Sequence, residues 1–308
     1  MNRGWDGICK VGIVQFMIFP EVMRGEGPVV ETITKIAADD FFGAMEITHI
    51  ADPEARRQVA GILAASHMAL GFGAQPMLLT NKLDLNHPEE AERRKAVDLM
   101  KAAIDEAAEL GIGRVAFLSG KDPGEAQRER ALDLLVDSTK ELCEYAKSRG
   151  VFLICETFDY DVEKRALIGP ARLAARYAER VKAQYDNFGL MYDLSHVPQL
   201  REDGLEGLSI LKPHLAHVHV GNCQLRNPNH PSYGDQHPRF GIPDGENDVP
   251  ELTAFLKALF QVGYLQEHPK GDLPVVAFEV KPMKGELSEV VLANAKRVWR
   301  EAWGRLEL

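Results

Sequence analysis

Short apolar runs alternate with longer amphipathic segments along the whole chain. Runs rich in β-branched residues predict strands, and apolar residues that recur every three or four positions predict helices. The expected strands are residues 10–16, 44–50, 69–79, 113–119, 151–157, 188–194, 215–221 and 274–280. The expected helices are residues 29–39, 53–67, 88–110, 124–149, 170–185, 204–213, 249–263 and 286–303.

This strict alternation indicates an α/β protein, and its continuously apolar strands indicate a parallel sheet that is buried on both faces. Eight strand–helix units favour a closed (β/α)8 TIM barrel. An open doubly wound sheet is the alternative, but no Gly-x-Gly-x-x-Gly motif follows the first strand. Because no linker interrupts the pattern, we expect one domain over residues 1–308.

Composition and charge limit the classes of partner that the protein is expected to bind. The chain is 45% hydrophobic and 27% charged, and its net charge of −10 argues against a nucleic-acid partner. Four scattered cysteines without a Cys-x-x-Cys pair are typical of a reducing compartment. No apolar run approaches the length of a membrane span, and the N-terminus lacks a leader-like pattern. We therefore expect a cytoplasmic protein with no membrane partner.

Polar side chains follow four consecutive strands. In such barrels the chemistry lies at the carboxyl ends of the strands. Glu156 ends the fifth expected strand, Asp193 the sixth and Glu279 the eighth, and His217 and His219 alternate on the seventh. Taken singly, a strand-end glutamate is more often an ion-pair partner, and a buried histidine is more often a core residue. Four such positions at one rim are much less expected by chance.

Three carboxylates that converge on an imidazole would repel one another without a cation. Mixed oxygen and nitrogen ligands suit Mn²⁺, Co²⁺ or Mg²⁺ better than a sulfur-rich zinc site. We therefore predict a divalent-metal centre, with Mn²⁺ as the first expectation.

The chain resembles the xylose isomerase-like barrels, which include ketose 3-epimerases, inosose dehydratases and endonuclease IV. The resemblance is carried by "CETFD", "YDLSH", "AHVHVGN", "GIPDGENDV" and "FEVKP". It implies that Glu156, Asp193, His219 and Glu279 ligate the metal, and that the two glutamates act as acid and base. The position of His196 binds metal or substrate in the family. The extra ligands of the three-zinc endonucleases cannot all be placed here, which argues against DNA repair.

A narrower resemblance rests on "GEGP", "FGAQP", "DYDVEKRALIGP" and "YGDQHPRFG". These phrases are similar to the catalytic subunits of bacterial C-glycoside deglycosidases, which deprotonate a 3-keto sugar beside its carbonyl and expel the aglycone. Such subunits work with a small β-rich partner chain. The partners implied are a sugar or glycoside substrate and either this subunit or further copies of the chain.

The segment 223–248 is long for a connection between a strand and a helix, and such loops are usually lids or binding surfaces. We predict that it folds over the metal and brings His237 or Arg239 to the substrate. His196, His217, Gln15, Gln75 and Lys281 are further candidates for substrate contacts. For the two glutamines, a role in local loop structure is equally expected.

The function predicted from these residues is proton abstraction next to the carbonyl of a sugar, in a keto-sugar isomerase or epimerase. Glu156 or Glu279 takes the proton and the other returns it, while the metal stabilises the charge that develops. Elimination of an aglycone, with His237 as general acid, is the lyase alternative. A barrel that binds sugar without catalysis is the second alternative.

Overall fold

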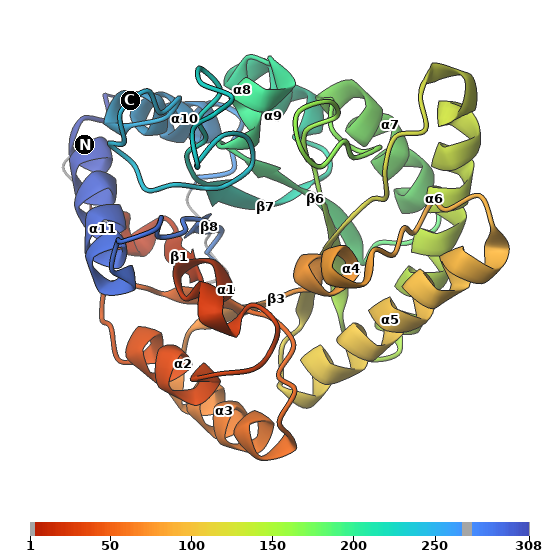
Figure 1. The fold of residues 1–308 in the computed structure, drawn as a ribbon, viewed down its shortest axis with the longest axis horizontal. Helices are drawn as coiled ribbons and strands as arrows, with labels where there is room; N and C mark the ends of the chain where they lie inside the picture. The colour runs from red at the N-terminus through yellow and green to blue at the C-terminus, as the bar shows by residue number, and fades with distance from the viewer. Residues whose placement is uncertain (1–3, 267–272, 308) are drawn as a thin grey trace.

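The computed structural model describes residues 4–266 and 273–307, and these form a closed barrel of eight parallel strands in chain order (Figure 1). The strands are β1 (Lys10–Val14), β2 (Ala44–Ile47), β3 (Ala69–Gly73), β4 (Arg114–Leu118), β5 (Phe152–Glu156), β6 (Phe188–Asp193), β7 (Leu215–Val220) and β8 (Val275–Phe278). Strand β1 pairs with β8 and closes the ring. The predicted (β/α)8 TIM barrel is confirmed.

Helices surround the ring, as Figure 1 shows. The long ones are α2 (Val29–Ala37), α3 (Pro53–Ser66), α5 (Glu90–Glu109), α6 (Glu125–Lys147), α7 (Ala171–Lys182), α9 (Gly204–Leu211), α10 (Val249–Gln261) and α11 (Ser288–Gly304). The short ones are η1 (Trp5–Gly7), α1 (Gln15–Ile18), η2 (Pro20–Val22), α4 (Gln75–Asn81) and α8 (His196–Leu200). Among the helices described, none has both the length and the apolar character that crossing a membrane would require.

Sequence signals explain where several of these helices begin. Asp52 caps α3 by accepting a hydrogen bond from the Glu54 backbone N–H, and Pro53 occupies the first turn. Asp248 and Glu251 form a reciprocal capping box at the start of α10. The cap at Asp248 also fixes the residue at which the long loop after β7 ends.

All eight predicted strands run past their observed carboxyl ends, and two of them run into a helix. The expected strands 10–16 and 69–79 end at Val14 and Gly73, and Gln15 and Gln75 instead begin the short helices α1 and α4. The apolar residues of both runs continue past the strand, so the pattern alone did not show the change. Pro76 was an available signal, because proline is favoured in the first turn of a helix.

The main apolar core lies between the sheet and the helices, where Trp299, Tyr177 and Tyr192 are among the largest fully buried side chains. The barrel interior is different. Two small apolar clusters line opposite parts of it: Ala44, Val275 and Ala277 form one, and Ala116, Ile154 and Met191 form the other.

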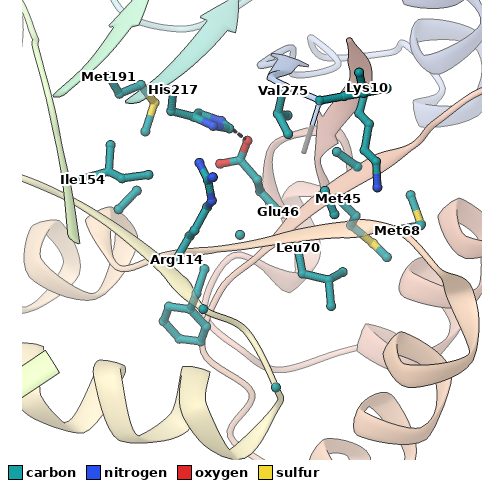
Figure 2. A pocket seen from close by; sticks show the side chains of 18 residues that line it. Lys10, Met45, Glu46, Met68, Leu70, Arg114, Ile154, Met191, His217 and Val275 are labelled. Atoms are coloured by element: carbon teal, nitrogen blue, oxygen red, sulfur yellow. Dashed lines mark hydrogen bonds and ion pairs between the residues drawn. The ribbon is translucent and has the colours of Figure 1, made fainter. Parts of the chain in front are cut away.

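Between these clusters the barrel is not filled. A cavity of about 420 Å³ occupies the half of the barrel nearest the amino ends of the strands. Figure 2 shows Lys10 and Arg114 among its lining side chains, and Glu46 bonded to His217 at the same cavity. TIM-barrel interiors are ordinarily packed with layers of large side chains, so the small residues here explain the space.

Candidate active site

The four side chains predicted to hold a metal converge at the carboxyl ends of the strands. Glu156 and Asp193 are the last residues of β5 and β6, His219 lies in β7, and Glu279 follows β8 directly. The register of β6 and β7 places Asp193 beside His219. One ligand atom from each of the four lies within 4.8 Å of those of the others, and all four residues are buried.

The orientation of the His219 ring defines the centre. Its Nδ1 lies 2.8 Å from Glu279 Oε2 and 3.9 Å from both Glu156 Oε1 and Asp193 Oδ2. Its Nε2 lies 3.0 Å from Glu46 Oε1, on the other side of the ring. Nδ1 is therefore the nitrogen that faces the three carboxylates.

Two carboxylate oxygens in this cluster, Glu156 Oε1 and Asp193 Oδ2, are buried without a hydrogen-bond partner. Leaving buried polar atoms unpaired is costly, and more so when they carry charge. A divalent ion among oxygen and imidazole ligands would satisfy both atoms. The residues present thus fit a metal ion.

The pKa values of the three carboxyl groups also favour a bound cation. Burial and the neighbouring charge of Glu279 raise the pKa of Glu156 to about 8, and burial raises the pKa of Asp193. Burial also opposes ionisation of Glu279, but His237 and His219 outweigh it and lower that pKa to about 2. All three carboxylates would be ionised together at neutral pH only with more positive charge in the site.

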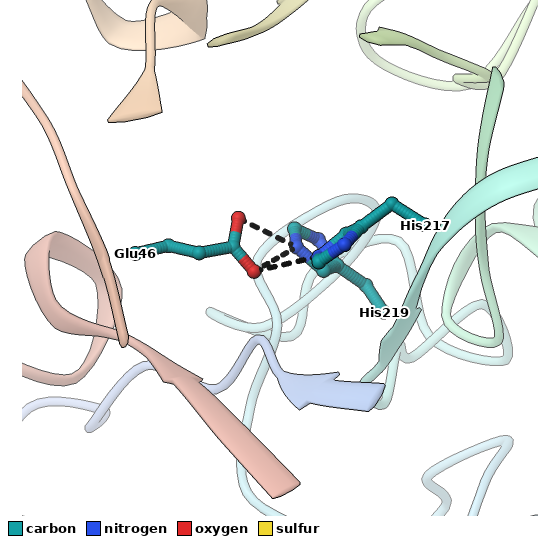
Figure 3. A group of neighbouring side chains, drawn as sticks. All are labelled: Glu46, His217 and His219. Carbon is teal, nitrogen blue, oxygen red and sulfur yellow. Dashed lines mark hydrogen bonds and ion pairs between the residues drawn. The ribbon is translucent and has the colours of Figure 1, made fainter. Parts of the chain in front are cut away.

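Glu46, in β2 (Ala44–Ile47), orients the proposed ligand His219, a role that sequence reasoning did not assign to it. Its carboxylate accepts hydrogen bonds from His217 Nε2 at 2.8 Å and from His219 Nε2 at 3.0 Å (Figure 3). Burial opposes its ionisation, but the two histidines hold its pKa well below the usual range. A carboxylate on the far nitrogen of a ligating histidine fixes the orientation of the ring. The available signal was a glutamate inside an apolar strand, the same signal that identified Glu156.

The long loop, residues 223–248, is fastened over this end of the barrel. Pro238 pairs with Lys281 in an isolated bridge, and the Lys281 backbone N–H donates to the His237 carbonyl at 2.7 Å. His237 has a left-handed backbone with φ 48°, which costs a non-glycine residue energy and is typical of functional positions. Its Nε2 lies 3.8 Å from Glu279 Oε1. The structure therefore brings His237 next to the cluster.

Asp235, on the same loop, gathers three cationic partners. Its Oδ1 lies 2.9 Å from His196 Nε2 and 3.0 Å from His237 Nε2, and its Oδ2 lies 2.9 Å from Lys164 Nζ. Burial opposes ionisation of Asp235, but Lys164 and the histidines hold its pKa well below the usual range. Burial lowers the pKa of each histidine, but neighbouring carboxylates raise it to about 10 for His196 and about 9 for His237.

The remaining predicted contacts divide into two groups. Gln75 donates to Glu156 Oε2 at 2.7 Å, and His196 Nδ1 lies 3.8 Å from Glu156 Oε1, so both border the cluster. The other four bond elsewhere: Gln15 to Thr32, Arg239 to Glu286, Lys281 to Gln236 and His217 to Glu46. His217 also lies two residues deeper in the barrel than His219 and lines the cavity.

Similar structures share this fold. The IOLI protein with a binding zinc atom superposes with a TM-score of 0.73 at 16% identity, covering 97% of this chain and 99% of the other. A D-tagatose 3-epimerase-like protein gives 0.68 at 19% identity, with 96% and 99% covered. The 3-keto-D-glucoside 4-epimerase YcjR from E. coli gives 0.66 at 14% identity, with 95% and 99% covered. At such identities the likeness shows the fold alone.

No curated protein sequence matches the chain significantly. The family model of the xylose isomerase-like TIM barrel matches residues 25–272, which is most of the chain. The match includes Glu156, Asp193 and His219, although Glu279 lies beyond its end. The chain belongs to the xylose isomerase-like TIM barrel family.

Proposed function

We propose that this protein is a divalent-metal-dependent enzyme that abstracts a proton next to the carbonyl of a keto sugar, as an isomerase or epimerase. The observation that carries the proposal is a pair of buried glutamates, Glu156 and Glu279, in one cluster with opposite pKa shifts. Carboxyl groups whose environments separate their proton affinities are typical of paired acid and base residues.

Glu156, Asp193, His219 and Glu279 would hold the ion, which when bound supplies positive charge for the oxyanion that enolisation creates. Glu279 is ionised beside His219 and His237, so it can accept the proton. Without the ion, burial and the charge of Glu279 make Glu156 the weaker acid of the two, so Glu156 is the carboxyl group that would return a proton. Gln75 donates to Glu156 Oε2 and thereby fixes the direction in which that carboxyl group points.

The names of two similar structures support the proposed substrate class. A D-tagatose 3-epimerase-like protein and a 3-keto-D-glucoside 4-epimerase share the barrel over nearly its whole length. Both names describe stereochemical change in a sugar with a carbonyl group. We therefore propose a small keto sugar or keto glycoside as substrate. A cytoplasmic location, Mn²⁺ as the metal, and a homo-oligomer or a small β-rich partner subunit stay predictions.

A panel of ketoses and 3-keto-glycosides in deuterated water tests the proposal, because exchange of the proton next to the carbonyl reports enolisation before any product is known. We expect exchange into at least one member of the panel, its loss on treatment with a chelator, and its return with Mn²⁺. A protein that binds Mn²⁺ but exchanges no proton in any substrate would instead support the non-catalytic sugar-binding barrel.

A carbon–carbon lyase is the second candidate, and the position of His237 favours it. The ring lies 3.8 Å from Glu279 and is held by Asp235, where it could protonate a leaving group. In a lyase, His237→Ala should abolish cleavage of a 3-keto-glycoside and leave proton exchange intact. In an isomerase the same change should lower turnover and proton exchange modestly and to the same extent. The ratio of cleavage to exchange therefore separates the two reactions.

A further inference from the structure

Lys164 lies in the irregular segment between β5 and α7 and reaches the edge of the proposed metal centre. Its Nζ lies 2.9 Å from Asp235 Oδ2 and 3.0 Å from Glu163 Oε1. The Lys164 side chain is only 18% exposed, and the Asp235 side chain is 2% exposed. A lysine is rarely buried to this degree unless its charge is paired, so this ion pair is a built feature of the site.

Beside this ion pair lies a second group of potential metal ligands. Asp193, His196 and His237 each offer an atom within 4.8 Å of the others, and all three are buried. Asp193 also belongs to the first cluster, so a second ion here would share that carboxylate with the first. One carboxylate and two imidazoles are a ligand set that zinc accepts.

The hydrogen bonds of the two histidines oppose such a second ion. His196 Nδ1 lies 2.7 Å from the Thr157 carbonyl oxygen, which can only accept, so this nitrogen carries a proton and has no lone pair to offer. His196 Nε2 and His237 Nε2 both face Asp235 Oδ1. Both rings are therefore turned toward Asp235, whose other oxygen is already paired with Lys164.

We propose that Lys164 is an internal counter-cation that limits the centre to one divalent ion per chain, and that it keeps His196 and His237 as hydrogen-bonding groups instead of ligands. The inference rests on the proposed metal site at Glu156, Asp193, His219 and Glu279. Without the ammonium, the region around Asp235 would carry one positive charge less, which favours a second divalent ion held by Asp193 and the two imidazoles.

The test counts bound ions. Metal-stripped wild-type protein, Lys164→Gln and Lys164→Arg are titrated with Zn²⁺ by calorimetry, and the zinc retained after gel filtration is measured per chain. Glutamine keeps most of the length of the side chain without its charge, and arginine keeps the charge. We expect one ion in the wild type, two in Lys164→Gln and one in Lys164→Arg. Adding His237→Ala to Lys164→Gln should return the count to one.

A wild-type chain that binds two ions overturns the inference, whether or not any variant folds. A Lys164→Gln protein that melts cooperatively and still binds one ion overturns it as well, while leaving the metal centre intact. A wild-type chain that binds no ion removes the metal centre itself, and the inference with it. If Lys164→Gln does not fold, Lys164→Ala is counted in its place against the same expectation.

Discussion

The two ends of the barrel interior differ in polarity, although the same strands supply the side chains of both. Ile154 and Met191 line the cavity near the amino ends of the strands, and Glu156 and Asp193, two residues further along, belong to the ionic cluster. Alternate residues of a strand share one face, so the barrel interior changes from apolar to charged within about 7 Å. The site is therefore one layer of side chains above a cavity whose lining is mostly small or apolar, with Glu46, His217, Lys10 and Arg114 as the exceptions.

Glu46 and His217 separate the two ends. Both line the cavity, and Glu46 also bonds to His219, which belongs to the proposed metal cluster. This difference predicts that a single change of charge at the carboxyl end should alter activity or metal affinity. A substitution at the amino end should mainly alter packing, and therefore stability. The predictions below test that contrast, beginning with the largest expected effect.

Removing the charge of either glutamate at the carboxyl end should have the largest effect. Glu156→Gln and Glu279→Gln should each lower enolisation by about 10²–10⁴-fold, because general acid–base catalysis contributes that much. Proton exchange into the best substrate of the panel measures the loss. Glu179→Gln, on the exposed face of α7, is the matched control and should retain full activity. Near-wild-type exchange in both site variants would remove the glutamates from the chemistry.

At the boundary between the two ends, Glu46→Gln should weaken Mn²⁺ binding by about 10–100-fold, because carboxylates that orient ligating histidines contribute this much. Calorimetry on metal-stripped protein gives the affinity. Arg114→Ala changes the charge of another residue that lines the cavity, but no ion pair joins this arginine to the cluster among the described residues. It should bind Mn²⁺ like the wild type. Equal losses of Mn²⁺ affinity in both variants would mean that the overall charge around the site sets the affinity, and that the orientation of His219 does not.

At the amino end, Ala116→Val should add apolar surface inside the cavity. Filling empty space with two further methyl groups should stabilise the protein by about 1 kcal/mol, as measured by urea unfolding, and should leave Mn²⁺ affinity unchanged. Ala103→Val, in the tightly packed α5, is the contrasting control and should destabilise the protein. A loss of metal affinity in Ala116→Val would show that the two ends are coupled through the strands.

The most gradual predicted effect is a pH dependence carried by His196. Burial lowers its pKa, but the charge and hydrogen bond of Asp235 raise it to about 10 in the folded protein. A raised pKa stabilises the fold fully below the unfolded value of about 6.5, and this stabilisation is lost as pH rises through the folded value. The difference in unfolding free energy between wild type and His196→Gln, measured with a chelator, should therefore shrink between about pH 6.5 and 10. A difference that stays constant over this range would contradict the assignment.

The sequence predicted most of the fold because alternation of strands and helices is a local property. It also predicted the main cluster, because a carboxylate at the end of an apolar strand, as at Glu156 and Glu279, is visible without knowing its neighbours. Lys164 was not found, since an irregular segment has no period that would point its side chain toward Asp235. Gln75 was placed on a strand, although it lies at the start of α4, because the apolar run masked the end of β3.

The bond between Glu46 and His219 joins residues that are 173 positions apart in the sequence. Such a contact cannot form while the second and seventh strands belong to separate, partly folded pieces of chain, because loop closure between distant residues comes late and at an entropic cost. A nascent chain that has emerged only through β6 has neither His219 nor Glu279 to complete the cluster. Tight metal uptake should therefore begin only when the ring has closed, which would make the ion a reporter of completed folding.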